Sequence, residues 1–141
     1  MNRGIFSERQ DISIALIGIK SVGKTAFLNR LKDNEFTEYT LSTCQNTFHE
    51  LLVMYTKNKY RLCVTDIPGE EVEMNEIHLE ESDMLLMFFD LTETEKSFPA
   101  ILGYLELIKK NIGPQKTLIL FGTKKDLFDS VRGVGFGYLI N

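Results

Sequence analysis

Features that mark a disordered, exported or membrane-spanning chain are scarce in this sequence. Only 3 of the 141 residues are proline, while 43% are hydrophobic and 26% are charged, a composition typical of soluble globular proteins. The longest apolar runs, such as Met84 to Phe89, are far shorter than the roughly 20 residues that span a bilayer. Residues 1–10 are mostly polar and lack the apolar core of a signal peptide. We therefore expect one cytoplasmic domain that folds alone.

Cysteine is also scarce, and its placement argues against a disulfide or a metal cluster. Cys44 and Cys63 form no metal-binding pattern, and both are expected to be free thiols because the chain has no export signal. No prenylation or myristoylation signal is present, so we expect no direct membrane anchor. The formal net charge of −4 leaves no basic surface for a polyanionic backbone, so we expect no nucleic-acid partner.

Short runs of branched and aromatic residues predict the strands of an α/β domain. The runs are Ile12 to Ile17, Phe48 to Tyr55, Tyr60 to Thr65, Met84 to Phe89 and Thr117 to Phe121. The second and third are separated by the polar turn Thr56 to Lys59, which predicts an antiparallel hairpin. The fourth is apolar on both faces, as expected of a central parallel strand covered by helices on both sides.

Two segments between these runs have helical periodicity. One begins at Thr25, and the other extends from Lys96 to Ile112, with Pro99 expected in its first turn. Strands and helices in this order predict an α/β sheet, and such sheets bind ligands at the carboxyl ends of their strands.

A phosphate-binding loop is predicted between the first strand and the first helix. Its residues are Gly18, Ile19, Lys20, Ser21, Val22, Gly23, Lys24 and Thr25, which fit the pattern G-x-x-x-x-G-K-[ST]. In such a loop the backbone amides and the helix N-terminus bind phosphates, Lys24 neutralises their charge, and the Thr25 hydroxyl coordinates Mg²⁺. The position between a strand and a helix makes a chance match improbable.

Two further motifs follow predicted strands. Asp66-Ile-Pro-Gly69 ends the third strand, so Asp66 could hold Mg²⁺ through water and the Gly69 amide could approach a phosphate. Thr123-Lys-Lys-Asp126 follows the fifth strand, where the Asp126 carboxylate could accept hydrogen bonds from N1 and the exocyclic amine of guanine. Each motif alone is more often a turn or a solvated loop. Together with the phosphate loop they predict a site for GTP.

This set of motifs resembles the Ras superfamily of small GTPases. The resemblance covers about residues 11 to 128 and implies a P-loop G domain, a mostly parallel sheet of order 2-3-1-4-5 with one antiparallel hairpin strand and helices on both faces. The segment Phe36 to Phe48 looks like the first switch of Rab proteins. That likeness assigns Thr43 to the γ-phosphate and Mg²⁺. It places Phe36, Thr123, Lys124 and Asp126 at the guanine, although Phe36 could instead be an ordinary core aromatic.

The second half resembles a narrower group. Thr123 in place of the commoner asparagine is seen in Rac-like proteins. Taken with Phe89 to Thr92 and Gly122 to Phe128, it looks most like the fungal septum-promoting GTPases, which start septation and mitotic exit from the spindle pole. The resemblance therefore implies a signalling or trafficking role, with a spindle-pole location as one form of it.

Three residues depart from the family pattern in ways that bear on hydrolysis. Glu70 stands where the family usually has the glutamine that positions the attacking water, and its charge would orient water differently. Lys20 stands where many members have glycine, so its side chain could obstruct an arginine finger, add favourable charge or point to solvent. Pro68 should stiffen the second switch. These departures predict slow hydrolysis.

The ends of the chain also differ from the family. We expect an N-terminal extension over residues 1–10, an incomplete G domain over 11–128 and a glycine-rich tail over 129–141 in place of the sixth strand and last helix. The missing elements would leave the fifth strand as an exposed edge. Truncation or mis-splicing would explain the tail, and a partner that completes the domain is the alternative.

Two hypotheses from different classes follow. The first is a Mg²⁺-dependent GTP/GDP switch whose effector, exchange factor and activating protein bind residues 36–48 and 66–80. The second is a non-hydrolysing, nucleotide-bound scaffold. A P-loop kinase or ATPase is disfavoured because it would leave Thr123 to Asp126 unexplained.

Overall fold

The described residues form a five-stranded sheet in the order β2-β3-β1-β4-β5. The computed structural model describes residues 10–33, 46–69, 76–111 and 116–132. The strands are β1 (Gln10–Ile17), β2 (Thr47–Tyr55), β3 (Asn58–Asp66), β4 (Met84–Asp90) and β5 (Thr117–Thr123). β1 pairs in parallel with β3 and β4, β4 pairs in parallel with β5, and β2 is antiparallel to β3. This arrangement confirms the strand order and the antiparallel hairpin expected from the sequence.

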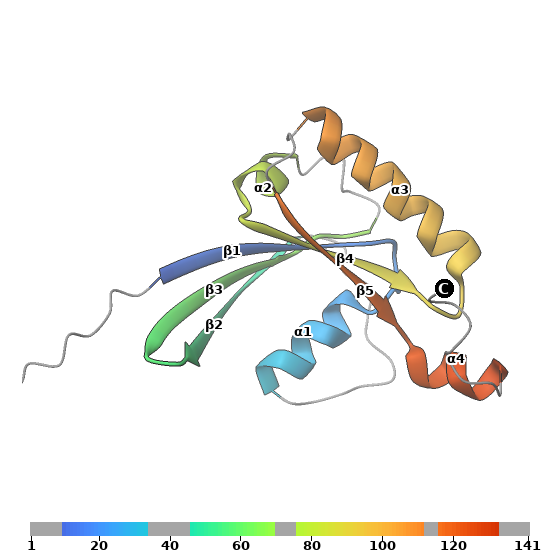
Figure 1. Cartoon of the computed structure of the whole chain (residues 1–141), viewed down its shortest axis with the longest axis horizontal. Coiled ribbons are helices and arrows are strands. Elements are labelled where there is room, and N and C mark those ends of the chain that lie inside the picture. Colours follow the sequence, from blue (N-terminus) through green and yellow to red (C-terminus); the bar gives the residue numbers. More distant parts are fainter. Residues whose placement is uncertain (1–9, 34–45, 70–75, 112–115, 133–141) are drawn as a thin grey trace, which may run out of the picture.

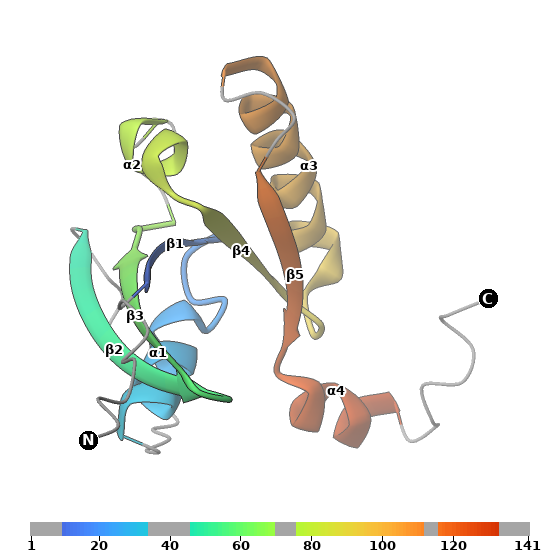
Figure 2. The same cartoon turned by 60° about the vertical axis from the view of Figure 1, so that its left-hand side comes forward.

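Helices cover both faces of the sheet, as expected. α1 (Lys24–Asp33) lies on one face, while α2 (Glu76–Glu81) and α3 (Thr94–Asn111) lie on the other (Figure 1). α4 (Lys125–Arg132) follows β5 and lies beyond its carboxyl end (Figure 2). Within the described part of the chain, no helix combines the length and the apolar character needed to cross a membrane.

The core is divided between the two faces by the alternation of side chains along β1 and β4. On the face covered by α2 and α3, the buried residues are Ala15, Ile17, Ile67, Leu79, Leu85, Met87, Ile101 and Ile108. On the face covered by α1, they are Ile14, Leu16, Val22, Leu28, Val64, Leu86 and Phe88. Because both faces of these central strands are buried, residues Ile14 to Ile17 of β1 and Met84 to Phe89 of β4 are continuous apolar runs in the sequence.

Three aromatic rings join α1 to the fifth strand. The Phe27 ring centroid lies 5.1 Å from that of Phe88 and 5.3 Å from that of Phe121, and the Phe88 and Phe121 rings stack at 5.3 Å. Such pairs add about 0.5–1.5 kcal/mol each beyond the area they bury. They hold the helix that begins at the phosphate loop against the strand that ends at Thr123.

The expected position of Pro99 was wrong. α3 begins at Thr94, before the expected Lys96, because the Glu93 carbonyl accepts hydrogen bonds from the amides of Lys96 and Ser97, each at 3.0 Å. Pro99 therefore lies in the second turn, where its nitrogen offers no hydrogen bond to the carbonyl four residues earlier. The expected end at Ile112 lies outside the described residues.

The hairpin turn is tighter than the sequence indicated. Tyr55 pairs with Asn58, so only Thr56 and Lys57 form the turn rather than Thr56 to Lys59. Thr56 takes a positive φ of 56°, as residues of two-residue hairpin turns do.

Two helices were not predicted. α2 has only Leu79 buried among its described side chains, so its sequence shows no apolar face. α4 begins inside the Thr123 to Asp126 motif and continues past Phe128, the expected end of the family-like region. The division at Phe128 itself stays a prediction.

The fifth strand is an exposed edge within the described residues. β5 pairs only with β4 in that part of the chain, and Leu118, Ile119 and Leu120 are 40%, 38% and 49% exposed. The apolar surface expected to face water at this edge is therefore present.

Candidate functional site

The carboxyl ends of four parallel strands bring the three sequence motifs together. The phosphate loop follows Ile17 at the end of β1, and its neighbour Leu16 pairs with Asp66 at the end of β3. On the other side, Asp90 at the end of β4 pairs with Thr123 at the end of β5. Residues that are far apart in the chain thus meet at one edge of the sheet, as expected of an α/β ligand site.

The backbone of the phosphate loop depends on its glycines. A Cβ atom at Gly18 would lie 2.7 Å from the Phe88 carbonyl oxygen and 3.0 Å from the Val22 Cγ1. Gly23 has a φ of 103°, which side chains rarely permit, and Ser21 has a φ of 61°. The loop therefore closes tightly over the end of β4 before it enters α1.

Lys24 is directed into the loop. Its side chain is buried, and Nζ donates hydrogen bonds to the carbonyls of Gly18 at 2.8 Å and Ile19 at 3.1 Å. Burial lowers the pKa of Lys24 to about 8, and the charge of Asp66 opposes this effect. A bound anion would restore the charged form, so this buried cation is suited to phosphate.

The two predicted magnesium ligands in the described residues lie side by side. The Thr25 hydroxyl donates to the Asp66 Oδ2 at 2.6 Å, and Asp66 is fully buried. A hydroxyl and one carboxylate are the oxygen donors with which proteins hold Mg²⁺ when phosphates supply the remaining ligands. The described residues contain no cluster of three or more His, Cys, Asp or Glu side chains suited to a metal. The third predicted ligand, Thr43, lies outside the described residues.

Gly69 lies directly against the phosphate loop. A Cβ atom there would lie 2.3 Å from the Lys20 amide nitrogen and 2.5 Å from the Ile19 carbonyl carbon. The Tyr104 hydroxyl on α3 donates to the Gly69 carbonyl at 3.1 Å. The structure therefore places the second motif beside the first, and it adds a tyrosine that the sequence did not single out.

The three residues of the predicted guanine motif have different surroundings. The Thr123 hydroxyl donates to the Val22 carbonyl at 2.6 Å and lies 3.1 Å from the Phe89 carbonyl, so it connects β5 to the phosphate loop. Lys124 forms an ion pair with Asp90 at 2.6 Å. Asp126 is exposed in the first turn of α4. The Asp126 carboxylate is thus exposed, and the Lys124 side chain is partly exposed, at 34%, with its ammonium group held by Asp90.

Some predicted residues cannot be placed. Phe36 and Glu70, like Thr43, lie outside the described residues, so their roles stay predictions. Lys20 is described, and its side chain is exposed to solvent, which is compatible with all three roles considered for it, so its role stays a prediction.

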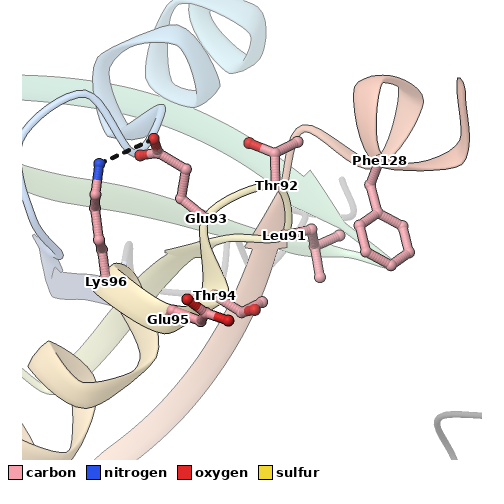
Figure 3. A pocket seen from close by; sticks show the side chains of 7 residues that line it. All are labelled: Leu91, Thr92, Glu93, Thr94, Glu95, Lys96 and Phe128. Carbon is pink, nitrogen blue, oxygen red and sulfur yellow. Dashed lines mark hydrogen bonds and ion pairs between the residues drawn. The ribbon is translucent and has the colours of Figure 1, made fainter. Parts of the chain in front are cut away.

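A pocket of about 400 Å³ opens beside this edge of the sheet (Figure 3). Its lining residues are Leu91, Thr92, Glu93, Thr94, Glu95, Lys96 and Phe128. An ion pair of 3.2 Å joins Glu93 to Lys96 on its wall. The described residues that line the pocket include none of the predicted phosphate or guanine residues, but Thr92 on its wall donates two hydrogen bonds to Asp90 Oδ1.

Comparison with known proteins agrees with this geometry. The model of the Ras family matches residues 13–135. The Ras-like GTP-binding protein RYL2 of Yarrowia lipolytica is 31% identical over 134 residues, which are 92% of this chain and 64% of that protein.

Two Rab proteins are similar over a shorter region. Rab-21 of Geodia cydonium and RabJ of Dictyostelium discoideum are each 28% identical over 116 residues, which are 81% of this chain and 50% and 45% of those proteins. The chain thus spans about half to two thirds of the length of these relatives. The match of the family model over most of the sequence, on the fold and motifs described above, shows that this chain belongs to the Ras family.

Proposed function

We propose that the chain binds GTP and GDP with Mg²⁺ and acts as a molecular switch. The observation that carries this proposal is the convergence of Lys24, the Thr25 and Asp66 pair, and Gly69 on one loop at the end of the sheet. The name of the Yarrowia lipolytica relative, a Ras-like GTP-binding protein, supports the same ligand.

The loop would bind the phosphates through its amides and through Lys24. Lys24 already lies within 2.8 Å of the loop backbone, so a phosphate would replace carbonyl partners with charged oxygens, which give stronger hydrogen bonds. Thr25 and Thr43 would hold Mg²⁺ directly and Asp66 would hold it through water. The ion supplies charge neutralisation to the phosphate oxygens when it is bound.

The base would be selected at the end of β5. Asp126 would accept hydrogen bonds from guanine N1 and the exocyclic amine, a pair of donors that adenine lacks. Phe36 would pack on the ring. Thr123 would hold the end of β5 against the phosphate loop, because its hydroxyl donates a hydrogen bond to the Val22 carbonyl.

Hydrolysis would be slow. Glu70 has a carboxylate where the family usually has a neutral glutamine that positions water. Beside a γ-phosphate this carboxylate would be repelled or would take up a proton. This part of the proposal depends on the sequence alone. Single-turnover hydrolysis measured for the parent and for Glu70→Gln tests it, since a fast parent rate that glutamine does not improve would contradict it.

Effectors and regulators would bind residues 36–48 and 66–80. In the described parts of these segments, Phe48 and Ile77 are 66% and 68% exposed, and the Phe48 ring centroid lies 5.7 Å from that of His78. Exposed apolar side chains on β2 and α2, two elements joined by the Phe48 and His78 contact, are suited to a protein partner. We place the switch in signalling or trafficking. Septation and a spindle-pole location stay predictions from the second half of the sequence.

Nucleotide binding is tested most directly on the purified chain. Chromatography after denaturation would identify co-purified guanine nucleotide, and equilibrium titration with GDP and ADP at equal Mg²⁺ would show a preference for GDP. Asp126→Ala should remove that preference and leave the fold intact, since Asp126 is exposed. Equal affinity of the parent for GDP and ADP would overturn the proposal.

A further inference from the structure

Asp90 is a buried carboxylate that lies outside the three motifs assigned to the nucleotide site. It ends β4, is 2% exposed, and its backbone amide donates to the Ser97 hydroxyl at 2.9 Å. Its Oδ1 accepts hydrogen bonds from the Thr92 amide at 2.8 Å and the Thr92 hydroxyl at 2.6 Å. Its Oδ2 lies 2.6 Å from the Lys124 Nζ. Both oxygens therefore have partners, and Lys124 is the charged one.

Lys124 is held in an unusual backbone conformation. Its φ is 58°, a region that residues other than glycine rarely occupy. It lies between Thr123, which binds the phosphate loop, and Asp126, the candidate reader of guanine. The ion pair with Asp90 fixes the Lys124 ammonium group, so the apolar stem of that side chain is free to pack along a flat apolar group beside it.

The electrostatics of Asp90 agree with a strong tie to Lys124. Burial would raise the pKa of the Asp90 carboxyl, but the hydrogen bonds from Lys124 and Thr92 outweigh it, and the pKa is lowered. Asp90 therefore stays charged and keeps Lys124 bound at neutral pH.

The neighbouring lysine provides a contrast within the same turn. Lys125 pairs with Asp129 at 2.5 Å, but both side chains are largely exposed, at 63% and 44%. In the Lys124 pair the corresponding values are 34% and 3%. Exposed pairs contribute little and exchange readily with water, whereas removal of one member of a buried pair leaves an uncompensated charge. Of the two pairs, only that of Lys124 and Asp90 can hold a side chain in one place.

We propose that Asp90 is a positioning residue of the base site, which holds the Lys124 ammonium at the end of β4 so that the lysine stem forms one wall against guanine. This inference rests on the proposed function, because it assigns Asp90 to the same nucleotide site. Asp90 acts through Lys124 and does not touch the base. In this arrangement Asp126 hydrogen-bonds the edge of the guanine ring, and Asp90 fixes the position of the Lys124 stem that covers the face of the ring.

Binding of GDP and inosine diphosphate to the full chain tests this assignment. Inosine lacks the exocyclic amine of guanine but has the same ring face, so a lost ring contact weakens both ligands equally. Displacement of fluorescent GDP should show that Asp90→Asn weakens both by about tenfold, the size of effect typical of residues that support a binding group. The ratio of the two affinities should stay at the parent value.

Two further variants show whether Asp90 acts through Lys124. Lys124→Met keeps an apolar stem but removes the ammonium group, so adding Asp90→Asn to it should weaken binding by less than about threefold more. Asp129→Asn, the matched control on the exposed pair, should stay within about twofold of the parent.

Several results would overturn the inference. It is wrong if Asp90→Asn binds GDP like the parent, if the two substitutions act additively, or if the preference for GDP over inosine diphosphate falls, which would mean that the whole motif had loosened. If Asp90→Asn does not fold, Thr92→Val decides, with an expected loss of about threefold from one hydrogen bond and no loss as the contrary result. A parent that binds GDP without these effects overturns this inference alone, whereas a parent that binds no GDP overturns the proposed function as well.

Discussion

The carboxyl end of the sheet and its edge strands distribute polar and apolar side chains in opposite ways. At the carboxyl end the charged residues Lys24, Asp66 and Asp90 are 6%, 0% and 2% exposed. On the β2 edge the apolar residues Leu52 and Met54 are 77% and 64% exposed. Burying charge and exposing apolar surface both oppose stability. The contrast agrees with the proposed binding of a charged ligand at the carboxyl end, and it leaves apolar surface exposed on the β2 edge.

The largest effect is expected at the phosphate loop. Gly18→Ala would place a methyl group 2.7 Å from the Phe88 carbonyl oxygen, and the loop could admit it only by moving backbone. We expect the free energy of unfolding to fall by about 2–3 kcal/mol, measured by denaturant titration.

A glycine in an open place is the control for Gly18. A Cβ atom at Gly103 on α3 meets no atom within 4 Å, so Gly103→Ala should stabilise the chain by about 0.5–1 kcal/mol. If both alanines destabilised equally, glycine itself rather than tight closure of the loop would be responsible.

The next effect concerns pH and Lys24. Its pKa in the folded chain is about 8, below the ordinary value of 10.5. Between these values the unfolded chain binds more protons than the folded chain, so the stability of the unliganded chain should rise with pH in this window. A polyphosphate favours the charged lysine, so GDP affinity should fall above pH 8 by up to about tenfold per pH unit.

The Lys24→Arg variant distinguishes the titration of Lys24 from the titration of the guanine base. Arginine stays charged throughout the range, and guanine titrates identically for both proteins. The ratio of parent to Lys24→Arg affinities, measured by calorimetry from pH 7 to 9, should fall as pH rises. A constant ratio would show that Lys24 does not change protonation at the site.

A smaller effect is expected where the second motif meets α3. Tyr104→Phe removes the hydroxyl that donates to the Gly69 carbonyl, and we expect a loss of about 1 kcal/mol in the free energy of unfolding. Tyr55→Phe on the exposed edge strand, at 69% exposure, should change it by less than about 0.5 kcal/mol. Equal losses, seen by thermal unfolding, would remove any special role for the Tyr104 hydroxyl.

The smallest effect on folding should come from the edge. Leu52→Lys replaces a side chain that is 77% exposed, so stability should change by less than about 0.5 kcal/mol. A charge on an edge strand also opposes pairing with other chains, so light scattering at high concentration should decrease. A large loss of stability would show that the β2 edge is packed rather than available.

The strands could be predicted because buried strands require apolar residues, and these form recognisable runs in the sequence. Residues buried on both faces give unbroken apolar runs, as in Met84 to Phe89, and the glycines of the phosphate loop are required by its closure. The short helix α2 could not be predicted, since Leu79 is its one buried side chain among those described. α4 escaped notice because it begins within a motif that was interpreted as a loop.

The contacts that build the site could not be predicted in the same way. The Asp90 and Lys124 pair joins the last residue of β4 to the residue that follows β5, and the Tyr104 hydroxyl reaches Gly69 across 35 positions. Neither has a spacing signal, because each depends on how α3 and β5 pack against the sheet. The motifs identified the residues expected to bind the ligand. The residues that contact and position them, such as Asp90 and Tyr104, are determined by packing.

The hydrogen bond from Thr123 to the Val22 carbonyl limits how early the site can form while the chain is being synthesised. These residues are 101 positions apart, so the phosphate loop leaves the ribosome long before the strand that ties it down. The β2 and β3 hairpin is local and can form early, and β1 can then pair with β3, but the other neighbour of β1 in the sheet is absent until β4 has been made. The nascent chain therefore cannot hold nucleotide in a finished site until nearly all of its described residues have been made.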